Sequence, residues 1–393
     1  MIKYVAVFVA FSIFSATSTV VSAQVSTIAG TGVHGSRDGE DPQFNMPSSV
    51  FQNLEGYLIV ADTYNNLVRT LDINTGYAAK LAGSILEEYL GEDLGIDNFG
   101  FPIGFFRDGE PDGEEAFFHR PSGGVTLQDG RLLIADSKNN ALRLIYEDGT
   151  VRTLSGGSED VAQMHGYVDG SLQEALFHHP SALALGPYNI VYVADTLNHA
   201  IRMIDIDAGT VTTLAGGQQG FENGDLEDAL FDSPMGIAVS QDGVVFVADT
   251  GNHKLRAIEN GQVRTVAGSF VMASDVDWLN DDDGLWLDDS KIGGFEDGNG
   301  EAALFNLPKG LSLSHTEPDI LIIADSGNHS IRRVTLNGSV TTIAGSGEPG
   351  HEDGPIYEAR FHFPSGVLSL ENGDIIVADT GNNQIRLIQL LIQ

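Results

Sequence analysis

The feature that most constrains this chain is a nine-residue segment that occurs six times, with the form Ala-Asp-Thr/Ser-x-Asn-Asn/His-x-x-Arg. Its aspartates are Asp62, Asp136, Asp195, Asp249, Asp325 and Asp379. Its arginines, each seven residues further along, are Arg69, Arg143, Arg202, Arg256, Arg332 and Arg386. Repeat units bury their apolar faces against their neighbours and fold as one array. We therefore expect residues 24–393 to form a single cooperative domain.

The interior of each unit predicts four short antiparallel strands. In the fourth unit, runs rich in Val and Ile occupy 236–239, 244–248, 254–258 and 263–266. Gln-Asp-Gly separates the first pair of runs and Asn-Gly separates the last pair, as expected of hairpin turns. Six units of four antiparallel strands predict an all-β fold, a six-bladed β-propeller.

Two further markers repeat with these strands. An Ala-Gly or Ser-Gly pair ends the fourth run, and Phe-x-x-Pro precedes the first, 18 residues before the repeat aspartate in five units and 20 in the fifth. The last unit has only three runs, whereas an extra copy of the fourth run stands at 25–29. We expect this N-terminal strand to complete the last blade, which closes the ring and removes an open sheet edge.

The first 23 residues have the pattern of a secretory signal peptide, with a lysine, an apolar run and small residues before a cleavage point after Ala23. The apolar run is too short to favour membrane insertion. The sequence therefore predicts a secreted, extracellular protein. It contains no cysteine, so the fold depends on core burial and ring closure rather than on disulfides.

The formal net charge is −35. Such a surface repels phosphate backbones, so nucleic-acid binding and attraction to anionic membranes are disfavoured. The acidity leaves two interpretations open: charge that keeps the protein soluble, or charge that binds cations.

Variation between units is concentrated in the connection that leads to each Phe-x-x-Pro. Two connections are long, with insertions at 84–107 and 269–296 that lead into units two and five. These units are three blades apart, so we expect the insertions to face each other across the central axis. They should lie on the same face as the six repeat turns, and insertions confined to one face usually mark the binding face.

Both insertions are acidic and aromatic. The second holds seven aspartates and both tryptophans. Its candidate calcium ligands are Asp277, Asp281 and Asp283, although the spacing is not that of an EF-hand. Trp278 and Trp286 are candidates for stacking on a sugar or anchoring a protein partner, and Tyr89, Phe105 and Phe106 of the first insertion are candidates for the same role. The alternative is a solvated loop.

The repeat segment, the Thr-x-Ala-Gly run and Phe-x-x-Pro together resemble the NHL repeat over all six units, 25–393. The resemblance implies a propeller that serves as an interaction platform. Six copies around a ring argue that the repeat Asp and Arg are structural: the Asp can accept turn N–H groups and the Arg can bridge to an acidic group. The histidines His199, His253 and His329 alternate with asparagines in this turn, which favours a polar cap over a metal cage.

The residues after each proline should surround the mouth of the central tunnel. They are Ser48, Ser122, Ser181, Met235, Lys309 and Ser365, and a small residue follows each of them. Lys309 is the candidate binding residue of this set. The set offers few general acids or bases, and it lacks the Glu, Asn and Asp ligands that six-bladed calcium lactonases use. Histidines near the Phe-x-x-Pro markers, such as His178 and His179, lack zinc-site spacing.

The sequence thus predicts a secreted binding or scaffold module for an extracellular protein or glycan. The predicted site is the face with the two insertions, with calcium as a candidate cofactor and no catalytic residues. The alternative is a metal-dependent hydrolase or lyase, similar to lactonases or to the amidating lyase, that acts at the tunnel mouth.

Overall fold

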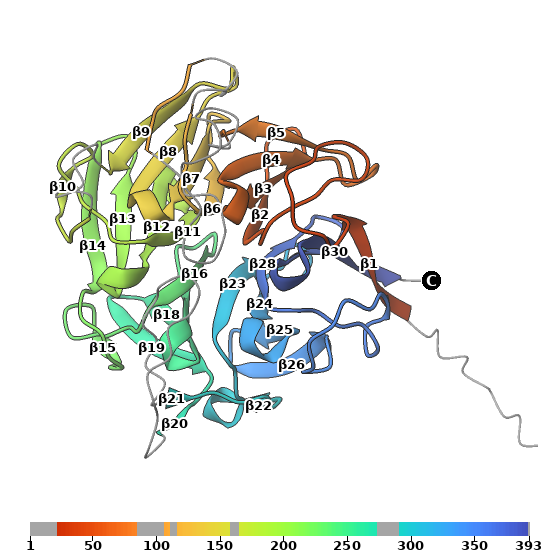
Figure 1. Ribbon diagram of the computed structural model, residues 1–393. Helices are drawn as coiled ribbons and strands as arrows, with labels where there is room; N and C mark the ends of the chain where they lie inside the picture. The colour runs from red at the N-terminus through yellow and green to blue at the C-terminus, as the bar shows by residue number, and fades with distance from the viewer. Residues whose placement is uncertain (1–21, 85–105, 111–115, 158–164, 273–290, 392–393) are drawn as a thin grey trace, which may run out of the picture.

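The computed structural model describes residues 22–84, 106–110, 116–157, 165–272 and 291–391. Six antiparallel sheets lie side by side around a central axis and form a closed ring (Figure 1). This arrangement confirms the predicted all-β, six-bladed propeller. The described residues contain no α-helix, only single turns of 3-10 helix. None of these turns could serve as a transmembrane helix.

Each blade has four main strands that run outward from the axis, in chain order in the first five blades. Blade 1 consists of β2 (Ser49–Gln52), β3 (Leu58–Asp62), β4 (Leu67–Leu71) and β5 (Ala78–Ala82). Blade 2 consists of β6 (Pro121–Thr126), β7 (Leu132–Asp136), β8 (Ala141–Ile145) and β9 (Val151–Gly156). Blade 3 consists of β11 (Pro180–Leu185), β12 (Ile190–Asp195), β13 (Ala200–Asp205) and β14 (Thr210–Gly216).

The second half of the ring repeats this order. Blade 4 consists of β16 (Pro234–Val239), β17 (Val245–Asp249), β18 (Lys254–Glu259) and β19 (Gln262–Ala267). Blade 5 consists of β23 (Pro308–Leu313), β24 (Ile320–Asp325), β25 (Ser330–Thr335) and β26 (Ser339–Ala344). Blade 6 consists of β28 (Pro364–Ser369), β29 (Ile375–Asp379), β30 (Gln384–Leu391) and β1 (Ser22–Ala29).

The N-terminal strand closes the ring as predicted. β1 pairs antiparallel with β30, from Ser22 opposite Leu391 to Ala29 opposite Ile385. It begins two residues before the cleavage point expected after Ala23, so that point lies within the paired strand. Short fifth strands add to the outer edge of four blades: β10 (Gly170–Ser171), β15 (Gly224–Asp225), β22 (Gly298–Asn299) and β27 (Gly354–Pro355).

The core lies between blades rather than within them. The phenylalanine of each Phe-x-x-Pro is fully buried, and Phe44, for example, packs with Val50 of blade 1 and Ile376 of blade 6. Burying one such side chain contributes about 1.5–3 kcal/mol. Each blade therefore depends on its neighbours, as expected of a repeat array.

A tight turn of 3-10 helix follows the second strand of every blade, as in η5 (Thr196–Asn198) between β12 and β13. The residue after each turn has a left-handed backbone, with φ between 50° and 57°. These residues are Asn66, Asn140, His199, His253, His329 and Asn383. Asn and His tolerate this conformation better than most side chains do, which is one reason that these two residue types alternate here.

Candidate functional site

The six repeat aspartates are fully buried at the ends of the second strands. Each carboxylate accepts the main-chain N–H of the residue after the Phe-x-x-Pro phenylalanine, at 2.7–2.8 Å. It also accepts the side-chain amide of the repeat Asn at 2.8–2.9 Å. The third donor is Nη1 of the repeat Arg, at 2.5–2.9 Å. These contacts leave the carboxylates no access to a ligand.

The arginines reach beyond this contact to a second acceptor that the sequence analysis missed. In blade 3, Nη2 of Arg202 donates to Asp169 at 2.7 Å, and the guanidinium lies between the rings of Phe177 and Tyr167, about 5 Å from each centroid. The six acceptors are Asp38, Asp108, Asp169, Asn223, Asp297 and Asp353. Each is followed by glycine and lies six to ten residues before the next Phe-x-x-Pro, so the signal was present but its spacing varied.

The two carboxylates that share an arginine have opposite pKa shifts. Burial raises the pKa of Asp195 to about 6, and Arg202 and the N–H donors oppose this rise. Partial burial also acts to raise the pKa of Asp169, but the Thr213 N–H and Arg202 outweigh it, so its pKa lies below the ordinary value. Both groups are charged at neutral pH. The arrangement is a buried ion-pair network that holds the blade together, and it has no proton to give to a substrate.

The Asn and His side chains of the turns connect neighbouring blades. The acceptor is Oδ1 of Asn or Nδ1 of His. The donor belongs to the next blade and is the main-chain N–H two residues after the phenylalanine of Phe-x-x-Pro, at 2.8–3.1 Å. The two residue types therefore perform the same task, because both place an acceptor at the same point. The geometry agrees with the polar cap, and the accepting Nδ1 atoms are not free to bind a metal.

This cap predicts a pH dependence for the histidine blades. Burial lowers the pKa of His253, while the unfolded chain has a value of about 6.5. Its contribution to stability is therefore present above pH 6.5 and is lost as the pH falls. Between pH 8 and pH 5.5, we expect the thermal midpoint of His253→Asn to fall less than that of the wild type. The exposed His34→Asn should follow the wild type in the same thermal unfolding series, and parallel curves for His253→Asn would refute this role.

A hydroxyl group next to each buried aspartate also links its blade to the next blade. The Thr or Ser of each repeat turn donates to the carbonyl of the next blade's Phe-x-x-Pro proline, at 2.5–2.8 Å. The last of these bonds joins Thr380 of blade 6 to Pro47 of blade 1. The circle of inter-blade bonds is therefore complete.

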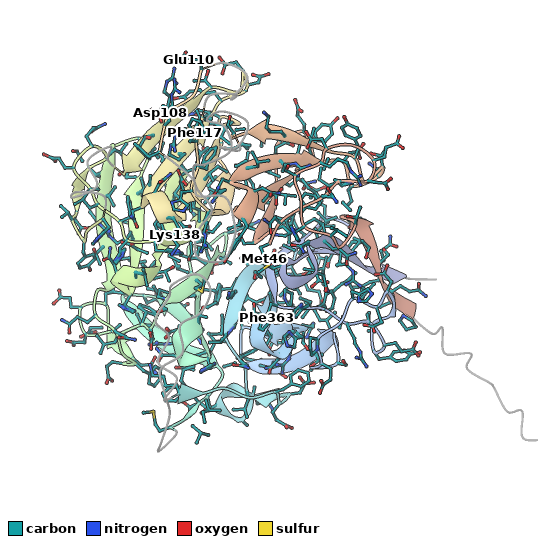
Figure 2. All side chains as sticks on the ribbon, viewed as in Figure 1. Met46, Asp108, Glu110, Phe117, Lys138 and Phe363 are labelled. Atoms are coloured by element: carbon teal, nitrogen blue, oxygen red, sulfur yellow. The ribbon has the colours of Figure 1, made fainter. Side chains whose placement is uncertain are left out.

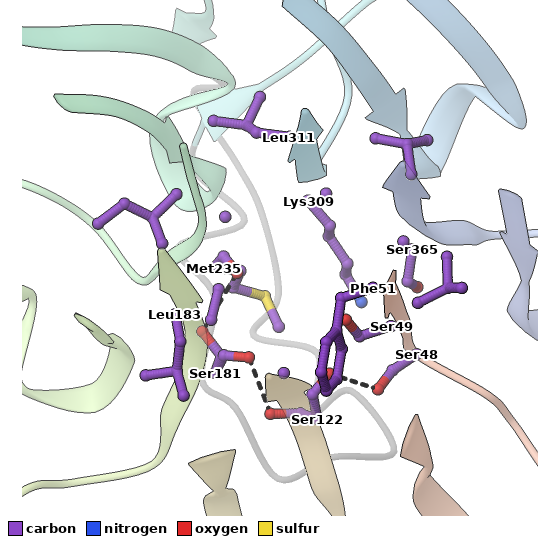
Figure 3. Close-up of a pocket in the computed structure, with 18 of the residues that line it drawn as sticks. Ser48, Ser49, Phe51, Ser122, Ser181, Leu183, Met235, Lys309, Leu311 and Ser365 are labelled. Carbon is purple, nitrogen blue, oxygen red and sulfur yellow. Dashed lines mark hydrogen bonds between the residues drawn. The ribbon is translucent and has the colours of Figure 1, made fainter. Parts of the chain in front are cut away.

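The inner strands enclose a cavity of about 590 Å³ on the axis (Figure 3). The residues predicted to surround the mouth all line it, together with apolar side chains further along the same strands. Three serines are tied to the wall: Ser48, Ser122 and Ser181 each donate to the carbonyl of the corresponding residue in the next blade, at 2.9, 2.9 and 3.2 Å. Met235 and Lys309 interrupt this pattern in blades 4 and 5, and their side chains extend into the cavity.

The charge of this lining differs from that of the rest of the protein. The cavity is lined by Lys309, Arg120 and two histidines, and by no aspartate or glutamate among the described residues. Among the residues that the structure describes, the ammonium of Lys309 has no hydrogen-bond or ion-pair partner. In a chain with 55 acidic residues, the charged side chains that are described in the lining of this central cavity are therefore basic.

A second ring of residues lies beside the mouth. These residues lie two positions after each Phe-x-x-Pro phenylalanine and all have a left-handed backbone: Met46, Arg120, His179, Ser233, Leu307 and Phe363. Five of them line the cavity and form its rim, whereas Ser233 is fully buried and does not. Met46 and Phe363 lie near the centre of the ring (Figure 2), and the Phe363 side chain is 45% exposed. This ring was not predicted from the sequence, although its position within Phe-x-x-Pro is fixed.

The predicted insertion residues fall into two groups. Phe106 is described, and its ring lies 4.9 Å from the Arg143 guanidinium, the position that Tyr167 occupies in blade 3; ligand binding by Phe106 stays a prediction. Outside the described residues lie Tyr89, Phe105, Trp278 and Trp286 and the candidate calcium ligands Asp277, Asp281 and Asp283.

The base of the second insertion is described and rests on the repeat-turn face. It is a hairpin of β20 (Val271–Met272) and β21 (Lys291–Ile292). Lys291 Nζ donates to the buried Asp232 at 2.6 Å, and the Lys291 carbonyl lies 3.1 Å from His253 Nε2 of the turn. This anchoring places the described base of the insertion on the repeat-turn face. Val271 and Met272 remain 66% and 62% exposed.

The described lining of the mouth does not fit the metals that the alternative function needs. Calcium takes six to eight oxygen ligands, usually with carboxylates among them, and the described lining has no carboxylate. Among the described residues, no three His, Asp or Glu side chains lie together as a metal site would require. The histidines beside the Phe-x-x-Pro markers do not form a zinc site in this part of the chain.

Comparison with known proteins agrees with this geometry. The family model of the NHL repeat matches residues 231–258 and 361–386. NHL repeat-containing protein 2 of Bos taurus is 26% identical over 428 residues, which cover 87% of this chain and 57% of that protein. The chain belongs to the NHL-repeat family. Protein SUPPRESSOR OF QUENCHING 1, chloroplastic, of Arabidopsis thaliana is 30% identical over 296 residues, 72% of this chain and 26% of that protein.

This NHL propeller thus spans between about a quarter and just over half of the length of these two relatives. Among solved structures, an auxiliary nutrient binding protein of Bacteroides ovatus superposes with a TM-score of 0.63 at 15% identity, over 94% of this chain and 77% of that one. At this identity the likeness concerns the fold alone.

Proposed function

We propose that this NHL propeller is a binding module that holds a protein partner on its repeat-turn face. The observation that carries the proposal is the composition of the rim. Met46, Leu307 and Phe363 surround the mouth together with Arg120, and Met, aromatic residues and Arg are enriched in protein interfaces. Interface hot spots also cluster at the centre of a contact surface.

Two further features support this face. The rim lies beside a cavity without described carboxylates, so a partner meets less of the repulsion that an acidic surface imposes. The hairpin β20–β21 presents Val271 and Met272 on the same face, and it forms the base of the acidic and aromatic insertion. The insertion residues are then a second part of the same surface, with calcium a prediction for that part.

The partner is proposed to be extracellular because residues 1–23 fit a signal peptide. Protein recovered from the culture medium of an expressing host should then begin at Gln24 in N-terminal sequencing. A chain that is retained in the cell with Met1 intact would contradict this location.

The test of the face is binding of the purified protein to an array of purified extracellular domains and to a glycan array. We expect a protein ligand whose affinity falls about tenfold or more in Phe363→Asn, since truncating a central anchor costs at least about 1.4 kcal/mol. Asn suits the left-handed backbone at this position, where φ is 47°, so the fold should be retained.

Tyr188→Asn is the matched control. Tyr188 is 90% exposed, also has a positive φ, and lies in the β11–β12 turn, at the opposite end of β12 from the repeat turn. It should bind like the wild type. Equal loss in both variants, or binding to glycans alone, would contradict a protein partner on the repeat-turn face.

A further inference from the structure

We propose that the axial cavity binds a monocarboxylate with an apolar body, and that Lys309 binds the carboxylate. This ligand site does not rest on the proposed protein partner, because it uses the wall of the cavity rather than its rim. The volume of about 590 Å³ falls within the range of about 300–1,000 Å³ that is typical of small-molecule sites.

Lys309 is a departure from the repeat. It follows the proline of blade 5, at a position where blades 1, 2, 3 and 6 carry serine. Its side chain reaches toward the centre of the cavity (Figure 3). An ammonium without a described partner, in a wall without described carboxylates, is suited to an anion.

The other polar side chains at the mouth are mainly neutral hydroxyls. Ser48, Ser122 and Ser181 line the cavity and donate to wall carbonyls. Ser49 also lines the cavity, and Lys309 extends toward it in Figure 3. These hydroxyls carry no negative charge that could neutralise the ammonium. A ligand can therefore supply the anion.

The wall beyond the mouth is apolar. The third residues after each proline include Leu183, Ile237, Leu311 and Val367, and all of them line the cavity. In blade 2 this position is Gly124, and the space is filled by the ring of Phe51, whose atoms would lie about 2.4 Å from an added Cβ. An apolar body below a carboxylate would contact this wall and be removed from water.

The experiment is isothermal titration calorimetry of the full chain with octanoate, 3-phenylpropionate and 1-octanol. The two acids distinguish an aliphatic from an aromatic body, and the alcohol has the same chain as octanoate without the charge. We expect one molecule of acid per chain, with 1-octanol at least about tenfold weaker than octanoate, because a hydrogen bond to a charged group is lost.

The variants are Lys309→Ser, which introduces the residue of four other blades, and Lys80→Ser, the matched control, which removes an exposed lysine of β5 that does not line the cavity. Lys309→Ser should bind octanoate at least about tenfold more weakly than the wild type, with 1-octanol affinity unchanged, while Lys80→Ser should stay within about threefold of the wild type for octanoate. Lys309→Met, which places in blade 5 the residue that blade 4 carries, tests the same loss if the serine variant fails to fold.

Three results would overturn the proposal: no binding of either acid, equal octanoate affinity in the wild type and both Lys309 variants, or 1-octanol binding as tightly as octanoate. None of these results bears on the protein partner, which is tested by Phe363→Asn. Conversely, if octanoate bound through Lys309 and no protein partner were detected, the axial site would still be supported and only the proposed partner would be contradicted.

Discussion

Replacing Arg202 with Met should be among the most destabilising single changes in this protein. The substitution leaves the carboxylate of Asp195 fully buried with no opposite charge, and it also removes the contact with Asp169. Breaking a buried ion pair on one side costs about 3–5 kcal/mol. We expect a large drop in the thermal midpoint and in the urea midpoint, both followed by circular dichroism.

Arg131→Met is the matched control, since it removes an arginine of similar size from a surface ion pair with Asp129. Exposed pairs contribute at most about 1 kcal/mol. If the two variants had equal midpoints, the buried network would not be what holds the blades together. The pH dependence offers a second check: without Arg202, the neutral form of Asp195 should be favoured further, so the loss should shrink as the pH falls.

Replacing Gly236 with Ala should also destabilise the fold strongly. A Cβ at this position would lie 1.8 Å from the carbonyl oxygen of Lys309 in the next blade. Since the neighbour is backbone, the inner strands β16 and β23 must separate, and overpacking of this kind costs about 1–3 kcal/mol or more. The expected result is a lower thermal midpoint together with reduced cooperativity of the transition.

Ser49→Ala is the control for this change. Ser49 is the equivalent residue of blade 1 and already carries a Cβ, so the variant removes a hydroxyl without adding volume. It should stay within about 0.5 kcal/mol of the wild type. If Gly236→Ala had the thermal midpoint of the wild type, the inner strands would be able to accommodate a methyl group here, which would contradict the expected crowding.

The fold could be predicted from the sequence because the same structural unit is repeated six times. The spacing between Phe-x-x-Pro and the repeat aspartate placed the strands, and the orphan run at 25–29 indicated closure through β1 and β30. The need of the repeat Asp and Arg for partners was also predictable. The second partner was not, because the Asp-Gly pairs such as Asp169-Gly170 lie at variable distances from the marker.

The crowding at Gly236 could not be predicted in the same way. A small residue was expected there, but Ala182 occupies the equivalent position in blade 3 without difficulty. Only the position of the adjacent blade decides which of these sites can hold a methyl group. The rim was missed for a related reason: Met46 and Phe363 share a backbone conformation rather than a residue type.

The candidate sites lie where the repeat is interrupted. Asp, Asn, Arg and the turn hydroxyl recur in all six blades and are engaged with one another, so they build the ring. Met235 and Lys309 depart from the serine pattern, and the rim residues all differ from one another. Differences between copies are the places where a symmetric scaffold can acquire a specific ligand.

The most direct test of this view is a crystal structure of the protein with bound octanoate. We expect the carboxylate within about 3 Å of Lys309 Nζ, with the alkyl chain directed along the axis toward Leu183 and Leu311. Octanoate bound only outside the cavity, or inside it with the carboxylate turned away from Lys309, would contradict an axial site built on Lys309.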